Sequence, residues 1–220
     1  PLLDVLGVAT FGLHYRGKSS SGKSTTLQVA RSAWGAPALL QSWRATSNGL
    51  EGVATAFNGA LLALDELGEA VPAEAAAAVY MLGNEQGRKR ALRDGRARPA
   101  ARSSTPSSSS TTAFLSSGEL GLADKIAETG RRATAGQAVR LIELAADRCA
   151  HGAFDDLHSA EHGAAFADRV TAAAAENFGT VGRAFVAQII AEGRDQVAAH
   201  VRALMAAFHD VAEAEHALQG

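Results

Sequence analysis

The sequence predicts an α/β protein in which a mostly parallel β-sheet is flanked by helices and followed by a helical C-terminal part. Short apolar runs bounded by Gly, Ser and Pro alternate with helical patterns over residues 1–146. Strands that alternate with helices form parallel sheets covered on both faces. From residue 147 to 220 strand signals stop, and Ala-rich segments with apolar residues at three- and four-residue spacing predict a helical subdomain.

The predicted elements follow in chain order. Each expected strand is a short apolar run between turn-forming residues, and each expected helix has an apolar stripe of helical period. The strands are expected at residues 11–15, 38–43, 60–64, 112–115 and 139–144. The helices are expected at residues 23–33, 48–57, 73–82, 164–177, 180–192 and 194–218. Residues 103–112 form a Ser/Thr-rich tract that lacks apolar content and predicts a loop.

Composition limits the class of protein. A chain of 220 residues with 47% hydrophobic residues can bury one sizeable core. Its net charge of -2 provides no global electrostatic argument for nucleic acid or membrane binding. The single cysteine, Cys149, excludes an internal disulfide and fits a reducing compartment. No apolar stretch approaches the roughly 20 residues that span a bilayer, so we expect no membrane span. Together with the reducing compartment that the cysteine usage fits, this predicts a cytoplasmic protein.

A phosphate-binding motif lies between the first expected strand and helix. Residues 17–24 read Gly-Lys-Ser-Ser-Ser-Gly-Lys-Ser and fit the Walker A pattern G-x-x-x-x-G-K-[ST]. Such a loop points its amides and the positive end of a helix at phosphates. We expect Lys23 to reach the β and γ phosphates of ATP and Ser24 to ligate Mg²⁺; the alternative is a flexible Gly/Ser-rich turn. The predicted nucleotide-binding residues are Gly17, Ser19, Ser20, Ser21, Gly22, Lys23, Ser24 and Thr25.

Two acids follow the third apolar run. Asp65 and Glu66 come directly after residues 60–64, as in a Walker B strand that fixes carboxylates at the carboxyl edge of a sheet. Asp65 is then the Mg²⁺-side carboxylate, and Glu66 is placed to orient or deprotonate a water molecule. A small-molecule kinase avoids such a residue because it would waste ATP. Alternatively, Glu66 only begins a solvated helix or loop.

A basic insert separates the third and fourth expected strands. Residues 86–102 contain seven Lys and Arg residues against one acid, a local charge of +6. Asp94 and Gly95 are a strong signal for a tight turn, so the insert is expected to be a hairpin. Basic side chains on a hairpin hold nucleic-acid phosphates without reading bases; the alternative is a solvated loop. The predicted DNA contacts are Arg88, Lys89, Arg90, Arg93, Arg96 and Arg98.

Polar residues near the last two strands are further candidates. Ser116 and Ser117 follow an apolar run, where they either approach the γ-phosphate or cap the next helix. Arg131, Arg132 and Arg140 precede or begin the last strand. Any of the three is a candidate arginine finger for a neighbouring subunit, and each is alternatively structural.

Several blocks of this sequence occur together in one known family. Residues 17–25, 42–52, 64–68, 80–84, 93–95 and 114–119, in this order, resemble the bacterial and phage family called domain of unknown function 927. Members resemble the ATPase parts of primase-helicase proteins of phages, plasmids and integrated elements, and are similar to superfamily 3 helicases. The resemblance implies an AAA+-like core assembled as a homo-oligomeric ring, with a DNA-gripping hairpin just before the sensor strand. The basic insert occupies that place.

These observations predict an ATP-hydrolysing motor domain of a DNA helicase or translocase acting on single-stranded DNA. The expected catalytic residues are Lys23, Glu66 and Ser117, with Arg132 or Arg140 as the arginine finger. One alternative is a small-molecule phosphotransferase in which the basic insert is a lid over phosphates. Another is a nucleotide-dependent DNA-binding module with little turnover.

Overall fold

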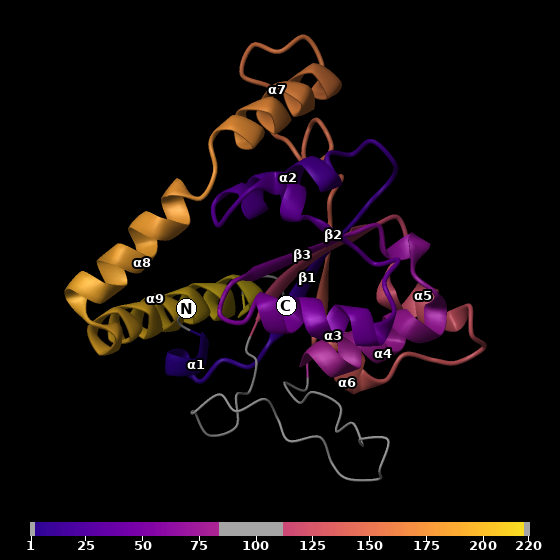
Figure 1. Ribbon diagram of the computed structural model, residues 1–220, viewed down its shortest axis with the longest axis horizontal. Helices are drawn as coiled ribbons and strands as arrows, with labels where there is room; N and C mark the ends of the chain where they lie inside the picture. Colours follow the sequence, from indigo (N-terminus) through magenta and orange to yellow (C-terminus); the bar gives the residue numbers. More distant parts are fainter. Residues whose placement is uncertain (1–2, 84–111, 218–220) are drawn as a thin grey trace.

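The computed structural model describes residues 3–83 and 112–217, and within them it is an α/β fold built on a parallel sheet (Figure 1). The strand order is β2-β3-β4-β1-β5 and every described strand pair is parallel. This confirms the expected sheet flanked by helices. The strands are β1 (Phe11–Arg16), β2 (Gln41–Ser42), β3 (Leu61–Asp65), β4 (Ala113–Gly118) and β5 (Leu141–Ala145). The basic insert and most of the Ser/Thr-rich tract lie outside the described residues.

β2 and β4 differ most in length from the prediction. The expected strand at residues 38–43 is reduced to β2, because a 3₁₀ turn, η1 (Pro37–Leu39), takes its first half. Pro37 has no amide hydrogen to donate to a neighbouring strand, and its fixed φ suits a turn. β4 runs beyond residue 115 to Gly118, because β1 pairs with it along its whole length and β3 along most of it.

The strand order decides which residues meet at the carboxyl edge of the sheet. β4 lies between β1 and β3, so the acidic strand is not a direct neighbour of the strand that precedes the Gly-rich loop. His14 of β1 and Leu64 of β3 are both in register with Ser116 of β4. The carboxyl ends of all three strands therefore lie side by side, and the residues that follow them converge at one place.

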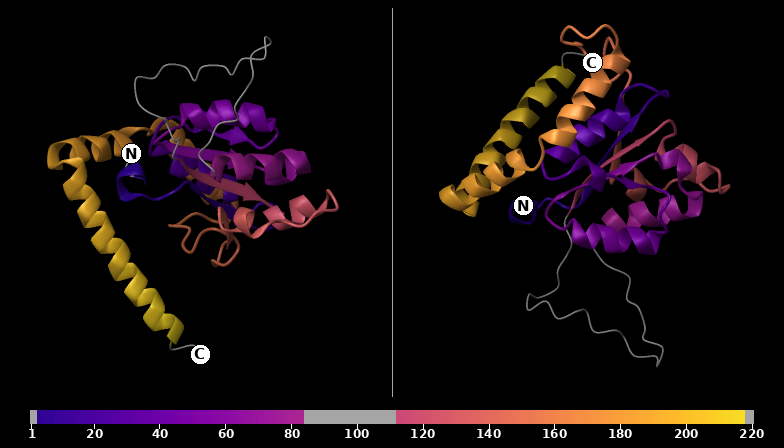
Figure 2. Two further views of the ribbon diagram at one scale, coloured as in Figure 1. Left: turned by 90° about the horizontal axis from the view of Figure 1, so that it is seen from below. Right: turned by 45° about the horizontal axis from the view of Figure 1, so that its top comes forward.

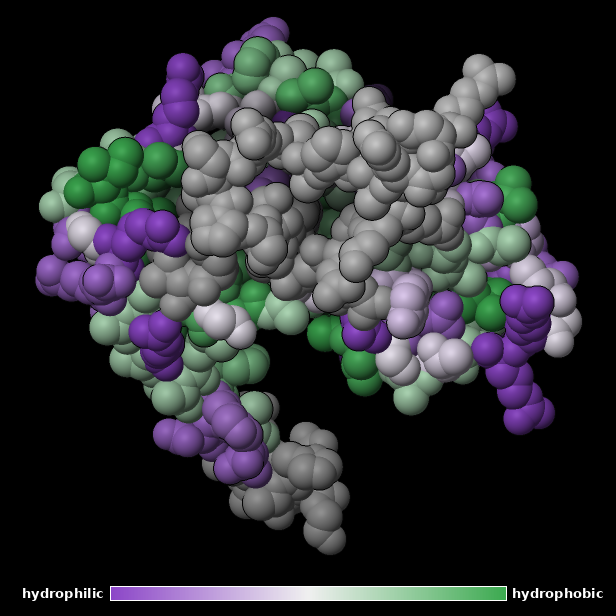
Figure 3. All heavy atoms as spheres, turned by 60° about the horizontal axis from the view of Figure 1, so that its bottom comes forward, coloured by the Kyte–Doolittle hydropathy of each residue, from purple (hydrophilic) through white to green (hydrophobic). Residues whose placement is uncertain are grey.

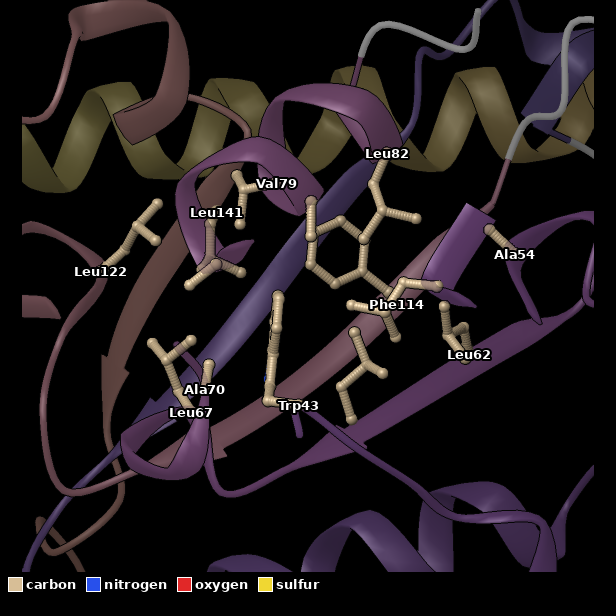
Figure 4. Packing of buried hydrophobic residues seen from close by; sticks show 14 of the residues in the cluster. Trp43, Ala54, Leu62, Leu67, Ala70, Val79, Leu82, Phe114, Leu122 and Leu141 are labelled. Atoms are coloured by element: carbon tan, nitrogen blue, oxygen red, sulfur yellow. The ribbon is translucent and has the colours of Figure 1, made fainter. Parts of the chain in front are cut away.

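Helices cover both faces of the sheet. α2 (Lys23–Ser32) packs on one face, and α3 (Ser47–Ala56), α4 (Pro72–Gly83), α5 (Leu122–Ala127) and α6 (Ala135–Ala138) lie on the other (Figure 1). The main apolar cluster lies between the sheet and this second group of helices; it includes Trp43, Leu62, Val79, Phe114 and Leu141 (Figure 4). Gly12 of β1 leaves room for the Phe114 ring in this cluster, since a Cβ at residue 12 would lie 2.3 Å from that ring.

The C-terminal part is helical after a short irregular segment. Residues 149–154 form two isolated bridges, Cys149 with Gly152 and His151 with Phe154. The expected helices follow as α7 (Gly163–Glu176), α8 (Thr180–Glu192) and α9 (Arg194–Ala217). α7 packs on α2, α1 (Leu3–Leu6) contacts α9, and α9 projects away from the sheet (Figure 2).

In α9 the apolar side chains of Leu204, Met205 and Phe208 are exposed. Hydrophobic and hydrophilic residues lie side by side on the face of the molecule drawn in Figure 3. Even so, none of the helices in the described ranges has the length and apolar character to cross a membrane.

Candidate functional site

The loop between β1 and α2 is a tight turn that ends at a helix N-terminus. Gly22 precedes α2 with φ +86°, a left-handed conformation that favours glycine. Ser20 is also left-handed, with φ 62°. A Cβ added at Gly22 would lie 2.8 Å from the Phe154 ring, so close packing also requires glycine here. The turn sets the loop directly before the positive end of α2.

The Lys23 side chain lies inside this loop and is buried. Its ammonium Nζ donates to the carbonyl oxygens of Gly17 at 2.9 Å and Lys18 at 2.7 Å, and to Ser21 Oγ at 3.4 Å. The loop therefore wraps around a positive charge. A loop of this kind fits an anionic group such as a phosphate.

Ser24, Asp65 and Ser117 meet although they come from three different elements. Ser24 Oγ donates to Asp65 Oδ1 at 3.1 Å, and Ser117 Oγ donates to the same oxygen. The Glu66 amide donates to Ser117 Oγ at 3.2 Å. A hydroxyl beside a single carboxylate fits Mg²⁺, which keeps several water ligands and takes few from the protein. Within the described ranges, no group of three or more His, Cys, Asp or Glu side chains is arranged to hold a metal ion.

Glu66 has an unusual backbone and an unusual carboxyl group. Its φ of 58° and ψ of 69° lie in the left-handed region, which is costly for a residue other than glycine. Burial and then the neighbouring Asp65 charge raise the pKa of the Glu66 carboxyl, while Lys23 opposes the shift. A carboxylate with raised proton affinity in a cavity is suited to accept a proton.

Lys23, Ser24 and Glu66 line a cavity of about 570 Å³, and Asp65 and Ser117 lie behind them. The first wall is the β1–α2 loop together with Glu66. The second wall comes from the C-terminal part of the chain and consists of His151, Gly152, Phe154, Gly163, Ala164, Ala167 and Asp168. Sequence patterns do not single out this second wall, because small and apolar residues without a motif have many structural roles. The weak sequence signal that this wall offers is a glycine two residues before an aromatic residue, Gly152 and Phe154.

Ser116 and Arg140, two candidates from the sequence, have partners away from this cavity. Ser116 is on the opposite face of β4, buried against His14 and Trp43, so the expectation that it approaches the γ-phosphate is wrong. Successive strand residues point to opposite faces, so Ser117 and Ser116 cannot both reach one site. Arg140 precedes β5 at the other edge of the sheet, where its guanidinium lies 5.9 Å from the centre of the Tyr80 ring and donates to the Gly136 carbonyl.

The remaining arginine candidates are exposed. Arg131 and Arg132 lie in the loop that precedes α6. The six predicted DNA contacts at residues 88–98 lie outside the described residues.

The chain is similar to one protein family and to one solved structure. The family model Domain of unknown function (DUF927) matches residues 1–102. No curated protein matches the chain. A solved structure, "SCCmec type IV Cch - active helicase", is similar with a TM-score of 0.60 at 22% identity over 90% of this chain. The similarity covers 32% of that protein, and at this identity it shows a shared fold.

Proposed function

We propose that this chain is the ATP-hydrolysing motor domain of a DNA helicase or translocase from a phage, plasmid or integrated element. The observation that carries the proposal is the 3.1 Å contact between Ser24 Oγ and Asp65 Oδ1. It pairs a hydroxyl at the start of α2 with a carboxylate from another strand, directly beside a loop wrapped around Lys23. Walker A and Walker B residues of a P-loop ATPase require this juxtaposition to hold Mg²⁺ and ATP.

Each residue of the site has a role in this proposal. Lys23 and the loop amides bind phosphates, and Ser24 and Asp65 hold Mg²⁺, which supplies charge neutralisation at the phosphates. Glu66 orients or deprotonates the attacking water, and its raised pKa favours proton acceptance. Ser117 fixes Asp65 and the Glu66 backbone through its hydroxyl. Arg132 or Arg140 remains the proposed arginine finger toward a neighbouring subunit of a ring.

The proposed partner is single-stranded DNA, bound without sequence preference. The proposal rests on the +6 charge of residues 86–102, which follow the helix after the acidic strand. The family match extends across this insert, and the similar solved structure is named an active helicase. We further propose that residues 147–220 form a separate helical subdomain that closes the nucleotide site.

The direct test is phosphate release from ATP with and without single-stranded DNA. The wild-type chain should hydrolyse ATP faster with DNA present, and Glu66→Gln should abolish hydrolysis. Glu176→Gln, which removes an exposed carboxylate on α7, is the matched control and should leave the rate unchanged. Transfer of phosphate only to an added acceptor would instead identify a phosphotransferase. Tight DNA binding with no hydrolysis would identify a binding module.

A further inference from the structure

We propose that residues 149–154 and α7 form the binding site for the nucleoside end of a nucleoside triphosphate. This inference rests on the proposed function and assigns a role to the wall of the cavity that carries no motif. The cavity, at about 570 Å³, is in the range of sites that enclose small organic ligands. It also extends from the β1–α2 loop to α7, beyond the residues that suit phosphates.

The two walls of this cavity differ in chemistry. The loop wall presents an ammonium group, serine hydroxyls and backbone amides, which suit an anionic group. The opposite wall presents Phe154, small residues, and two polar side chains, His151 and Asp168. A ligand that satisfies both walls has a charged end and a flat, partly apolar end with hydrogen-bond donors. A nucleoside triphosphate has this construction, and inorganic phosphate does not.

One face of α7 leaves space for the nucleoside end of the ligand. Gly163, Ala164, Ala167 and Asp168 follow the spacing i, i+1, i+4, i+5, which places them on the same side of a helix. The first three have little or no side chain, so they leave the space next to the helix open. A Cβ added at Gly163 would meet no atom within 4 Å.

The second wall is fixed in place against the first. The Ala153 amide donates to the Ser21 carbonyl at 2.8 Å, and a Cβ on Gly152 would lie only 2.6 Å from the same oxygen. The Phe154 ring packs edge-to-face with Phe166, with ring centres 4.9 Å apart. The spacing between the walls is therefore set before any ligand binds, which reduces the entropy lost on binding.

Asp168 orients the ligand. Its carboxylate accepts hydrogen bonds and repels phosphates, so the triphosphate belongs at the opposite wall, near Lys23. The hydrogen-bond donors of a nucleoside include its sugar hydroxyls and, in adenine, guanine and cytosine, an exocyclic amino group. Asp168 is exposed and lines the cavity, so it is free to accept from such a donor.

The test compares Mg²⁺-ATP with Mg²⁺-tripolyphosphate, which lacks the nucleoside, by isothermal titration calorimetry. Ala164→Phe fills the α7 side of the cavity from an exposed position; Ala173→Phe, exposed on the opposite side of the same helix, is its control. We expect Ala164→Phe to weaken ATP binding about tenfold or more and leave tripolyphosphate binding unchanged, whereas Ala173→Phe changes neither. Asp168→Ala should weaken ATP binding several-fold and not weaken tripolyphosphate binding.

Unchanged ATP affinity in both Ala164→Phe and Asp168→Ala would overturn the inference. A variant that loses as much affinity for tripolyphosphate as for ATP would also overturn it. Wild-type protein that binds tripolyphosphate as tightly as ATP would also overturn it, while leaving a phosphate site intact. If the wild-type protein binds neither ligand, the proposed function itself fails.

Discussion

The two faces of β4 at its carboxyl end carry the same residue type in opposite roles. Ser116 and Ser117 are adjacent and both fully buried. Ser116 faces the apolar cluster under α4 and contacts His14 and Trp43. Ser117 faces the α2 side and contacts Asp65 and the Glu66 amide. Alternation along one strand thus separates a structural hydroxyl from a site hydroxyl.

The network on the Ser116 side is closed and neutral. The Leu120 carbonyl can only accept, so His14 Nε2 carries the proton that donates to it at 2.9 Å. His14 Nδ1 then accepts from Ser116 Oγ at 2.8 Å, and that oxygen accepts from Trp43 Nε1 at 2.9 Å. Desolvation by burial lowers the pKa of His14, which keeps the ring neutral. By contrast, the Ser117 side gathers the charges of Lys23, Asp65 and Glu66 beside a cavity, as chemistry on a charged substrate requires.

The largest expected effect lies on the charged face. Asp65→Asn keeps an oxygen that can accept from Ser24 and Ser117 but removes the charge, so the fold should survive while Mg²⁺ binding is lost. We expect ATP hydrolysis to fall by about 100-fold or more, with the free energy of unfolding changed by less than about 1 kcal/mol. Steady-state kinetics and urea denaturation measure the two quantities. If Asp65→Asn hydrolyses ATP as fast as the wild-type protein, Asp65 does not hold the Mg²⁺ ion.

The two serines provide a matched pair. Ser116→Ala leaves His14 Nδ1 and Trp43 Nε1 without their hydrogen-bond partner, and we expect it to lower the free energy of unfolding by about 1–3 kcal/mol without slowing hydrolysis. Ser117→Ala should slow hydrolysis by about tenfold, because the Glu66 backbone and Asp65 lose a shared contact. Urea denaturation and steady-state kinetics on both variants measure these two effects. Equal losses of stability and of hydrolysis rate in the two variants would contradict the different roles of the two serines.

The neutral network should also show in the pH dependence of stability. Because the folded pKa of His14 is lowered, the unfolded chain binds the proton more readily, and stability should fall as pH drops below about 6.5. A single such group contributes at most about 1.4 kcal/mol per pH unit. Urea denaturation between pH 5 and 8 measures how the free energy of unfolding changes with pH, and this dependence should be weaker in His14→Gln than in the wild-type protein. An identical slope in that variant would show that other groups cause it.

The smallest expected effect concerns Glu66. Glu119 is one of the carboxylates that raise the pKa of Glu66, after burial and Asp65. Since Glu66 must be ionised to accept a proton, Glu119→Gln should move the acid limb of the hydrolysis rate toward lower pH. Glu119 is exposed and screened by solvent, so we expect a shift of about a few tenths of a pH unit. A shift toward higher pH would exclude Glu66 as the titrating group.

The amino-acid sequence by itself determined the local features of this protein. The pattern from Gly17 to Ser24 between an apolar run and a helix, and the acids at residues 65 and 66, locate the β1–α2 loop and the end of β3. The apolar runs locate all the described strands, and the Ala-rich pattern locates α7, α8 and α9. These features are readable because turn chemistry and hydrophobic period act over a few residues.

Only the tertiary structure decided how distant segments meet. It inserted β4 between β1 and β3, which brings Ser117 to Asp65 and turns Ser116 toward His14. It also placed residues 149–154 and α7 against the β1–α2 loop and so completed the cavity. Strand order and the packing of a motif-free segment depend on contacts between residues far apart in the chain, which leave no periodic trace in the sequence.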